Sequence, residues 1–187
     1  MGLNIKIDFD DCYDIIESRP DLKLHKFNTV LKGGDEKKLG IVIDEQPHHL
    51  LPEVYNMAFG PIDDNNNIDD LVKITHDNIS KTLSTIVLTA LTFLNKNPAT
   101  YLGIDGSNNA RAYMYYRCIN NNYEYLSKYF KMYGVNYYVR VLRKLNDEDL
   151  FCPVDNNDRL AIPTEISFGE FIPSDKLYNY FIFKLKA

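Results

Sequence analysis

Apolar and polar residues alternate in several stretches of the chain, and this pattern predicts β-strands. Residues Leu3–Phe9 alternate in this way, and Leu22–Leu31 begins with the same pattern. The turn "KGGDEK" leads into a third such stretch, "LGIVIDE", and "EVYNMAFGPI" predicts a fourth strand. Because alternate side chains of a strand point to opposite faces, these segments predict an antiparallel meander with one solvated face.

A different spacing in the middle of the chain predicts the longest helix. Apolar residues recur there every three or four positions, at Leu83, Ile86, Val87, Ala90, Leu91 and Leu94. This spacing puts them on one face of a helix. Pro98 cannot continue the helix, and the "TYLGI" that follows predicts a short strand.

The second half of the chain predicts two shorter helices and two more strands. "SNNARAYMYYRCIN" has a helical stripe, and "NYEYLSKYFKMY" predicts a second helix that ends at Gly134. "VNYYVRVLR" and the final "YNYFIFKLK" alternate like strands. Residues 146–177 are rich in Asp, Glu and Pro, so we expect a long excursion over the surface.

The order of these elements predicts the fold class. Several strands, a helix, a strand, two helices and further strands are typical of an α+β fold. We therefore expect a single domain over residues 1–187, in which a mostly antiparallel sheet packs against one long helix and two shorter helices.

Composition and the start of the chain narrow the class of protein. Hydrophobic residues make up 45% of the chain and charged residues 25%, as in soluble globular proteins. The acids in "MGLNIKIDFDDCYD" are unlike a secretory signal, and the longest uncharged run is shorter than the about 20 residues of a membrane span. Cys12, Cys118 and Cys152 have no C-x-x-C spacing. We expect a cytoplasmic protein with reduced cysteines and no membrane association.

Charge is unevenly distributed along the chain. Residues 101–144 contain seven basic and two acidic residues, a local charge of +5, whereas the whole chain carries −5. Ten of the 14 tyrosines lie in the same stretch. Basic side chains interleaved with aromatic rings suit phosphate contacts and base stacking, but they also suit a tyrosine-rich core edge surrounded by solvated Lys and Arg. Both interpretations remain open from the sequence.

One junction in this stretch is the candidate binding site. In "GIDGSNNARAYMYYR" a turn leads directly into a helix, where Gly106 permits close approach of a ligand and Ser107 can cap the helix. Arg111 can bind a phosphate or carboxylate with two hydrogen bonds, and Tyr115 lies one turn further on the same face. We predict that these four residues bind a ligand. The structural alternative is a capped helix with Arg111 paired to a neighbouring acid.

Other motifs do not predict a metal, cofactor or nucleophile site. An EF-hand read from Asp63 has Ile68 in place of the required glycine and Ile74 in place of the bidentate glutamate. His48 and His49 are adjacent, so in an extended chain their side chains point to opposite faces. We expect a hydrated turn at the first site, no metal ligands at the second, and no cofactor.

Three motifs resemble a family of small uncharacterised bacterial proteins. "VYNMAFG", "IDD" and "GSNNARAYMYYRCI" occur in this order, and they resemble Val-Tyr-Asn-Leu-Ala-Phe-Gly, Ile-Asp-Asp and Gly-Ser-Thr-x-Ala-Arg-Thr-Arg-Leu-Tyr. The candidate site residues that match are Gly106, Ser107, Arg111 and Tyr115. Tyr113 stands where the family has a second arginine. The resemblance covers residues 53–134 and the last strand, and it implies a domain of unknown function.

Three functions remain open from the sequence. The first is a binding module for an anionic partner, such as nucleic acid or another phosphate-bearing ligand, whose affinity falls steeply with salt. The second is a phosphodiester-acting enzyme or toxin of a small two-gene module, in which Arg111 stabilises charge and Tyr115 or Asp105 transfers the proton. The third is a protein–protein interaction domain that uses a sheet edge or the acidic surface. The oligomeric state is not predicted.

Overall fold

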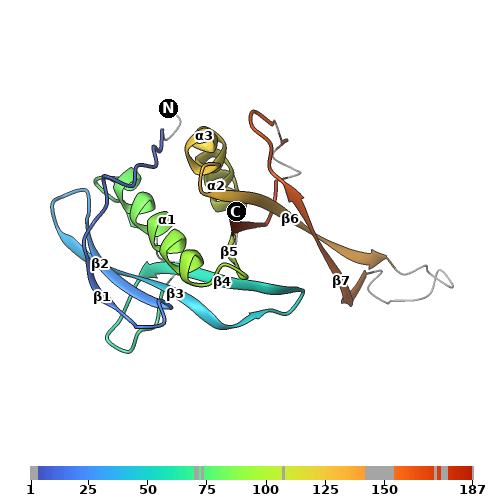
Figure 1. The fold of residues 1–187 in the computed structure, drawn as a ribbon, viewed down its shortest axis with the longest axis horizontal. Coiled ribbons are helices and arrows are strands. Elements are labelled where there is room, and N and C mark those ends of the chain that lie inside the picture. Colours follow the sequence, from blue (N-terminus) through green and yellow to red (C-terminus); the bar gives the residue numbers. More distant parts are fainter. Residues whose placement is uncertain are drawn as a thin grey trace, which may run out of the picture.

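The computed structural model describes residues 4–69, 72, 74–106, 108–141, 154–170, 172–173 and 177–186. These residues form a single α+β domain in which helices pack on a mostly antiparallel sheet, as predicted (Figure 1). The strand order in the sheet is β1-β2-β3-β4-β5-β8-β6-β7. In chain order the elements are β1 (Ile15–Ser18), β2 (Leu24–Val30), β3 (Glu36–His48), β4 (Leu51–Pro61), α1 (Ile79–Lys96), β5 (Tyr101–Asp105), α2 (Asn109–Asn121), α3 (Tyr123–Leu126), β6 (Phe130–Val141), β7 (Val154–Glu165) and β8 (Tyr180–Leu185).

A helical crossover separates the first half of the sheet from the second. Strands β1 to β4 form an antiparallel meander, in which β2, β3 and β4 are predicted strands, whereas β1 takes the place of the predicted strand Leu3–Phe9. α1 then carries the chain to β5, which pairs parallel to β4 from Val54↔Tyr101 to Asn56↔Gly103. β8 lies antiparallel between β5 and β6, with β7 at the outer edge. In the described part of the sheet, β4 and β5 are therefore the one parallel pair.

α1 is the predicted long helix, and its apolar stripe is buried. Its N-cap is Asn78, whose side-chain oxygen accepts the Lys81 amide hydrogen at 2.9 Å. The helix ends at Lys96, before Pro98, as the sequence predicts. Burying a Leu or Ile side chain contributes about 1.5–3 kcal/mol, so the stripe supplies much of the core energy. The buried members of the stripe are Leu83, Ile86, Ala90, Leu91 and Leu94. No helix in the described part of the chain is long and apolar enough to span a membrane.

The central strands bury both of their faces. On β8, Phe181 and Phe183 belong to the main core beneath the helices, whereas Tyr180 and Ile182 belong to a smaller cluster on the opposite face. α1 and α2 lie on the same side of the sheet (Figure 1). A site between these two helices therefore lies on the main-core side.

Residues 4–9 do not form a strand, which corrects the prediction for Leu3–Phe9, of which Leu3 lies outside the described residues. Ile5 and Ile7 are buried, as the alternation requires. The backbone, however, bonds to side chains of the helices: the Ile7 amide donates to Asn122 Oδ1 at 2.8 Å, and Asn122 Nδ2 donates to the Ile5 carbonyl at 2.9 Å. Alternation indicates only that every second side chain is buried. In this segment the backbone forms its hydrogen bonds with side chains instead of with the backbone of a neighbouring strand. The neighbouring amides donate to hydroxyls of Ser80, Ser84 and Tyr125.

The second short helix is much shorter than predicted. α3 covers only Tyr123–Leu126, and β6 begins at Phe130. Phe130 and Met132 are buried, while Lys131 between them is exposed. Helical spacing and strand alternation overlap in this stretch, and pairing with β8 decides in favour of the strand. Gly134 is therefore not a helix stop but lies within β6.

Part of the predicted surface excursion belongs to the sheet. Val154–Glu165 forms β7, which pairs with β6. β7 is an edge strand, where Pro163 and the many polar residues are tolerated because one side of the strand has no neighbour in the sheet. Residues 146–153, 171 and 174–176 of the predicted excursion lie outside the described residues.

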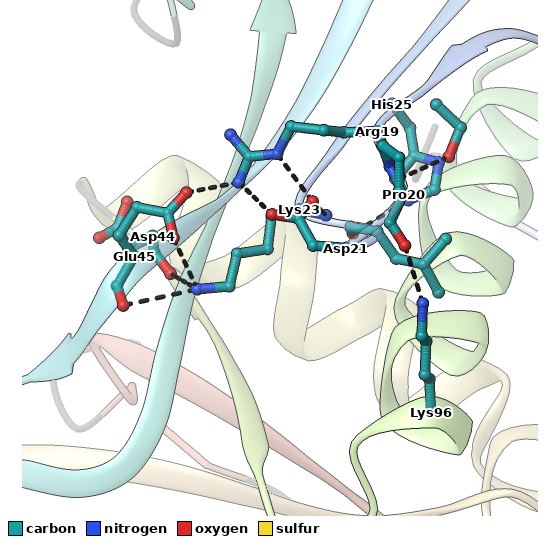
Figure 2. A network of polar contacts seen from close by, with 10 residues as sticks. Arg19, Pro20, Asp21, Lys23, His25, Asp44, Glu45 and Lys96 are labelled. Carbon is teal, nitrogen blue, oxygen red and sulfur yellow. Dashed lines mark hydrogen bonds and ion pairs between the residues drawn. The ribbon is translucent and has the colours of Figure 1, made fainter.

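A network of polar contacts joins the β1–β2 turn to β3 and to the end of α1. Figure 2 shows Arg19 paired with Asp21 and Glu45. Lys96, in the last turn of α1, donates to the Pro20 carbonyl at 2.7 Å. The hydrogen bond from Arg19 is the main reason that the pKa of Asp21 falls to about 2. Because exposed ion pairs contribute little to stability, the network mainly positions the hairpin beside the helix.

Gly134→Ala is expected to destabilise the protein, because β6 touches the Tyr178 ring at this position. A Cβ atom at Gly134 would lie 2.0 Å from Tyr178 Cδ2, and Tyr178 is buried. Forcing an extra atom into a packed core costs about 1–3 kcal/mol. We expect the free energy of unfolding, measured by urea denaturation, to fall by this amount.

Asn136→Ala is the matched control for this substitution, because it lies two residues further along β6. We expect it to change the free energy of unfolding by less than about 0.5 kcal/mol. Equal stability of the Gly134→Ala variant and the wild type would contradict the close packing of β6 against Tyr178.

Candidate functional site

A pocket of about 280 Å³ lies between α1 and α2, above the ends of β4 and β5. The two strands pair as far as Asn56 and Gly103, and α2 begins shortly after β5 ends. The carboxyl ends of parallel strands, followed by a helix, leave a crevice in which α/β units commonly bind ligands. The pocket therefore has the position expected of a ligand site.

The structure brings Arg111 and Tyr115 together in this pocket. Both line it from α2, one helical turn apart. Arg111 is half-buried, and Tyr115 is buried with its ring edge-to-face against Phe59 and Phe181. Packing against two rings restricts the orientation of Tyr115. The two residues that the sequence placed on one helix face thus reach one cavity.

The mouth of the pocket carries charges of both signs. Of the described residues that line it, Arg111 is positively charged, whereas Asp69 and Asp105 are negatively charged. Asp105 ends β5, and the sequence indicated it as an alternative group for proton transfer. The sequence did not assign Asp69 to this site: it is position 7 of the rejected EF-hand, and it also lies in the "IDD" motif that carries part of the family resemblance. That motif was the signal that could have identified it.

Gly106 does not line the pocket, but it lies against α2, which does. A Cβ atom at Gly106 would lie 2.9 Å from Ala112 Cα, so the missing side chain allows α2 to approach the turn after β5. The Gly106 amide donates to the Asn179 carbonyl at 2.9 Å. Gly106 therefore positions α2, and its amide is already hydrogen-bonded within the protein.

The cap of α2 is a different residue from the one predicted. Ser107 lies outside the described residues, and the N-cap is Asn108. Asn108 Oδ1 accepts the backbone amide hydrogen of Arg111 at 3.0 Å. Since this amide is bonded within the helix, the Arg111 side chain is the better candidate for contact with an anion.

A histidine that no motif indicated forms a polar wall of the pocket. His76 lines the cavity, and its Nδ1 lies 3.0 Å from Thr29 Oγ1. Thr82 Oγ1 lies 3.1 Å from the same Thr29 hydroxyl, and both threonines are buried. Desolvation by burial lowers the pKa of His76, which favours the neutral ring. Thr29 is 47 residues from His76 and 53 from Thr82 in the sequence, so no local spacing predicted the group.

A second cavity of about 40 Å³ adjoins the pocket on the core side. The two cavities share lining residues from β4, α1 and α2, among them Met57, Ile86 and Tyr115. No charged side chain occurs among the described residues that line the inner cavity. Its thiol, Cys118, has a pKa raised to about 12 by burial, so it is not a reactive thiolate. The pocket thus has a charged mouth and an apolar inner end.

The Asp- and Asn-rich turn and the histidine pair lie outside this pocket. Asp63 Oδ1 accepts the amides of Asn65 and Asn67 at 2.9 and 2.8 Å, which is the hydrogen bonding of an ordinary turn. His48 and His49 stack with ring centroids 4.7 Å apart, because β3 ends there and the chain turns. Among the described residues, no group of three or more His, Cys, Asp or Glu side chains is placed to hold a metal ion.

The basic, tyrosine-rich stretch is divided among several environments. Arg111 lines the pocket, whereas Arg117 lies 5.8 Å over the ring of the exposed Tyr113. Tyr113 stands where the family resemblance has a second arginine, and it is outside the pocket lining. Tyr115 and Tyr116 are buried, as the core-edge interpretation expects. Of the seven basic side chains in residues 101–144, those of Arg140, Arg143 and Lys144 lie outside the described part of the structure.

Stability is expected to fall as the pH drops below about 6.5, because desolvation lowers the pKa of His25, His48 and His76 in the folded protein. The unfolded chain, with ordinary histidine pKa values, then binds more protons than the folded chain. This contribution to stability is complete above the unfolded pKa and is lost as the pH falls below it. Urea denaturation between about pH 7.5 and 5.5 measures the change.

His76→Gln is the informative variant for this pH dependence. It removes one of the three titrating groups, so the slope of stability against pH should become smaller. A wild-type denaturation midpoint that stays constant over the same range would contradict the assignment.

Comparisons with known proteins identify a family for the chain. The sequence profile of a family of unknown function, DUF6934, matches residues 11–149. This range includes every described residue that lines the pocket, and it contains the residues that carry the resemblance to an uncharacterised family. Neither the curated proteins nor the solved structures give a significant match. Since most of the sequence matches the profile, the chain belongs to the DUF6934 family, whose function is unknown.

Proposed function

We propose that this protein is a cytoplasmic binding domain for a small anionic ligand, which Arg111 recognises in the pocket between α1 and α2. The observation that carries the proposal is the presence of the Arg111 side chain in a cavity of about 280 Å³. A guanidinium donates two parallel hydrogen bonds to a carboxylate or phosphate, which gives affinity and fixes orientation. A cavity of this size suits a small molecule rather than a polymer.

The surroundings of Arg111 strengthen its attraction for an anion. Apolar side chains such as Met57, Ile86 and Met114 line the same pocket. Walls of low polarity raise the Coulomb energy between two charges relative to open water. Arg111 also lies in the first turn of α2, where the helix dipole favours negative charge.

Nucleic acid as the anionic partner stays a prediction, and it would use a different part of α2. A polymer requires basic and aromatic side chains along an exposed surface. The exposed Tyr113 and Arg117 provide such a contact, whereas Arg111 lies in a pocket. Filter binding of nucleic acid by the Arg117→Gln and Arg111→Gln variants, at low and high salt, separates the two ideas. A polymer on this surface depends on Arg117, whereas a pocket ligand depends on Arg111.

The enzyme alternative would use the same pocket. Arg111, Tyr115 and Asp105 line it together, and His76 adds a group that can accept a proton. A phosphodiester-acting enzyme requires one group that stabilises charge and another that transfers a proton, and these residue types are present. This alternative, including a toxin of a small two-gene module, stays a prediction. Growth on expression of the wild type and Arg111→Ala, at equal protein levels, tests it.

A protein–protein role would use the β6–β7 hairpin, which extends away from the helices (Figure 1). Tyr138, Leu160 and Ile162 are exposed on it. An edge strand with exposed apolar side chains can pair with a strand of a partner. This role also stays a prediction, and a pull-down with hairpin variants tests it.

Arg111→Gln is expected to weaken binding of the anionic ligand at least about tenfold, because the variant loses the charge and the paired donors. Calorimetric titration with small molecules that carry a phosphate or carboxylate measures this loss: inorganic phosphate, simple carboxylates and amino acids. Arg117→Gln is the matched control, since Arg117 lies on the same helix but outside the pocket. It should leave the affinity unchanged.

Circular dichroism of both variants shows whether the fold is intact. Two results would contradict the proposed function. One is equal affinity of the wild type and the Arg111→Gln variant, and the other is no binding of any of these molecules by the wild type.

A further inference from the structure

We propose that the ligand is an aliphatic α-amino acid, with its carboxylate on Arg111, its ammonium facing Asp69 and Asp105, and its side chain in the inner apolar cavity. This inference rests on the proposed anion site at Arg111 and names the ligand class for it. It depends on three features: the guanidinium, the two carboxylates at the same mouth, and the adjoining apolar cavity.

The charges at the mouth favour a zwitterion over a simple anion. The described lining contains one positive charge, on Arg111, and two negative charges, on Asp69 and Asp105. A ligand that is only anionic places its charge beside two carboxylates, and like charges repel at short range. An α-amino acid carries its ammonium one carbon atom away from its carboxylate. Both of its charged groups can therefore meet opposite charges in the same small space.

The inner cavity limits the size of the ligand side chain. It has a volume of about 40 Å³. A single water needs at least about 10–15 Å³ of such space, so the cavity takes only a short alkyl group. A branched alkyl group fills it, and a long alkyl chain is too large.

The contrast between the two cavities fixes the orientation of the ligand. Val87, Ala90 and Cys118 line only the inner cavity, where a charged group would lose its water without a partner. Asp69 and Asp105 are exposed at the mouth, where charged groups keep contact with solvent. The ligand therefore enters with its apolar side chain first and leaves its charged groups outside.

Four probes that differ by one group test this proposal by calorimetric titration of the wild-type protein. L-leucine has all three features, 4-methylpentanoate lacks the ammonium, 3-methylbutylamine lacks the carboxylate, and glycine lacks the side chain. We expect leucine to bind most tightly and each of the others to bind at least about tenfold more weakly.

Two variants assign the groups to the protein. Asp105→Asn should weaken leucine binding and should not weaken 4-methylpentanoate binding, because only leucine carries the ammonium and the variant removes a carboxylate that repels an anion. Ala90→Leu fills the inner cavity, so it should weaken leucine at least about tenfold and leave the weaker binding of glycine unchanged. If circular dichroism shows that the Ala90→Leu variant does not fold, titration of the wild-type protein with the four probes still tests the proposal.

The outcomes separate this inference from the proposed function. If 4-methylpentanoate binds as tightly as leucine, or if phosphate binds and leucine does not, the amino-acid assignment is overturned and the anion site stands. Glycine or 3-methylbutylamine binding as tightly as leucine also overturns the assignment. If neither leucine, 4-methylpentanoate nor inorganic phosphate binds, both the ligand class and the anion site are overturned.

Discussion

The burial of one face of α1 against the sheet is the constraint on which the rest of the structure depends. Ile86 and Leu94 on this face have only 2% and 0% of their surface exposed. Because α1 crosses from β4 to β5, its packing places these two strands side by side and parallel. The pocket follows from this arrangement, since its walls are α1, the end of β4 and the helix that follows β5. Loss of the α1 packing would therefore remove the site together with the core.

The polar residues of α1 organise two further parts of the molecule. The hydroxyl of Ser84 accepts the backbone amide of Asp8, so the N-terminal segment is held without a strand partner. Buried amides must find an acceptor, and a helix rich in Ser and Thr supplies one through its side chains. Thr82, on the same helix, connects through Thr29 to the His76 ring. One helix thus positions the apolar core, the start of the chain and the polar wall of the pocket.

The chemistry of the pocket comes from the contrast between its two ends. Arg111, Asp69 and Asp105 stand at an open mouth, while the inner end is lined by apolar side chains. Charged groups are costly to remove from water, whereas apolar groups gain free energy when they leave it. A molecule that carries both kinds of group on a short skeleton satisfies both ends, and this is the physical basis for the ligand class that we propose.

Elements with one unambiguous period were predictable from the sequence, and elements with two competing periods were not. α1 and β8 carry a single clear pattern, and both occur where the pattern placed them. The stretch from Tyr123 to Tyr133 fits a helix and a strand equally well, and only pairing with β8 made Phe130 the start of β6. The alternation in the N-terminal segment correctly indicated buried Ile5 and Ile7, but burial alone does not supply a neighbouring strand.

The sequence by itself determined that Arg111 and Tyr115 share one surface, because residues four apart on a helix always lie on the same face. Only the tertiary structure decided which other groups meet them. Asp69 and His76 lie between β4 and α1, whereas Asp105 ends β5, and the crossover of α1 brings these two parts of the chain to one cavity. The spacing of residues within one element cannot predict that these side chains lie close together, because their approach depends on which faces of distant elements pack against each other.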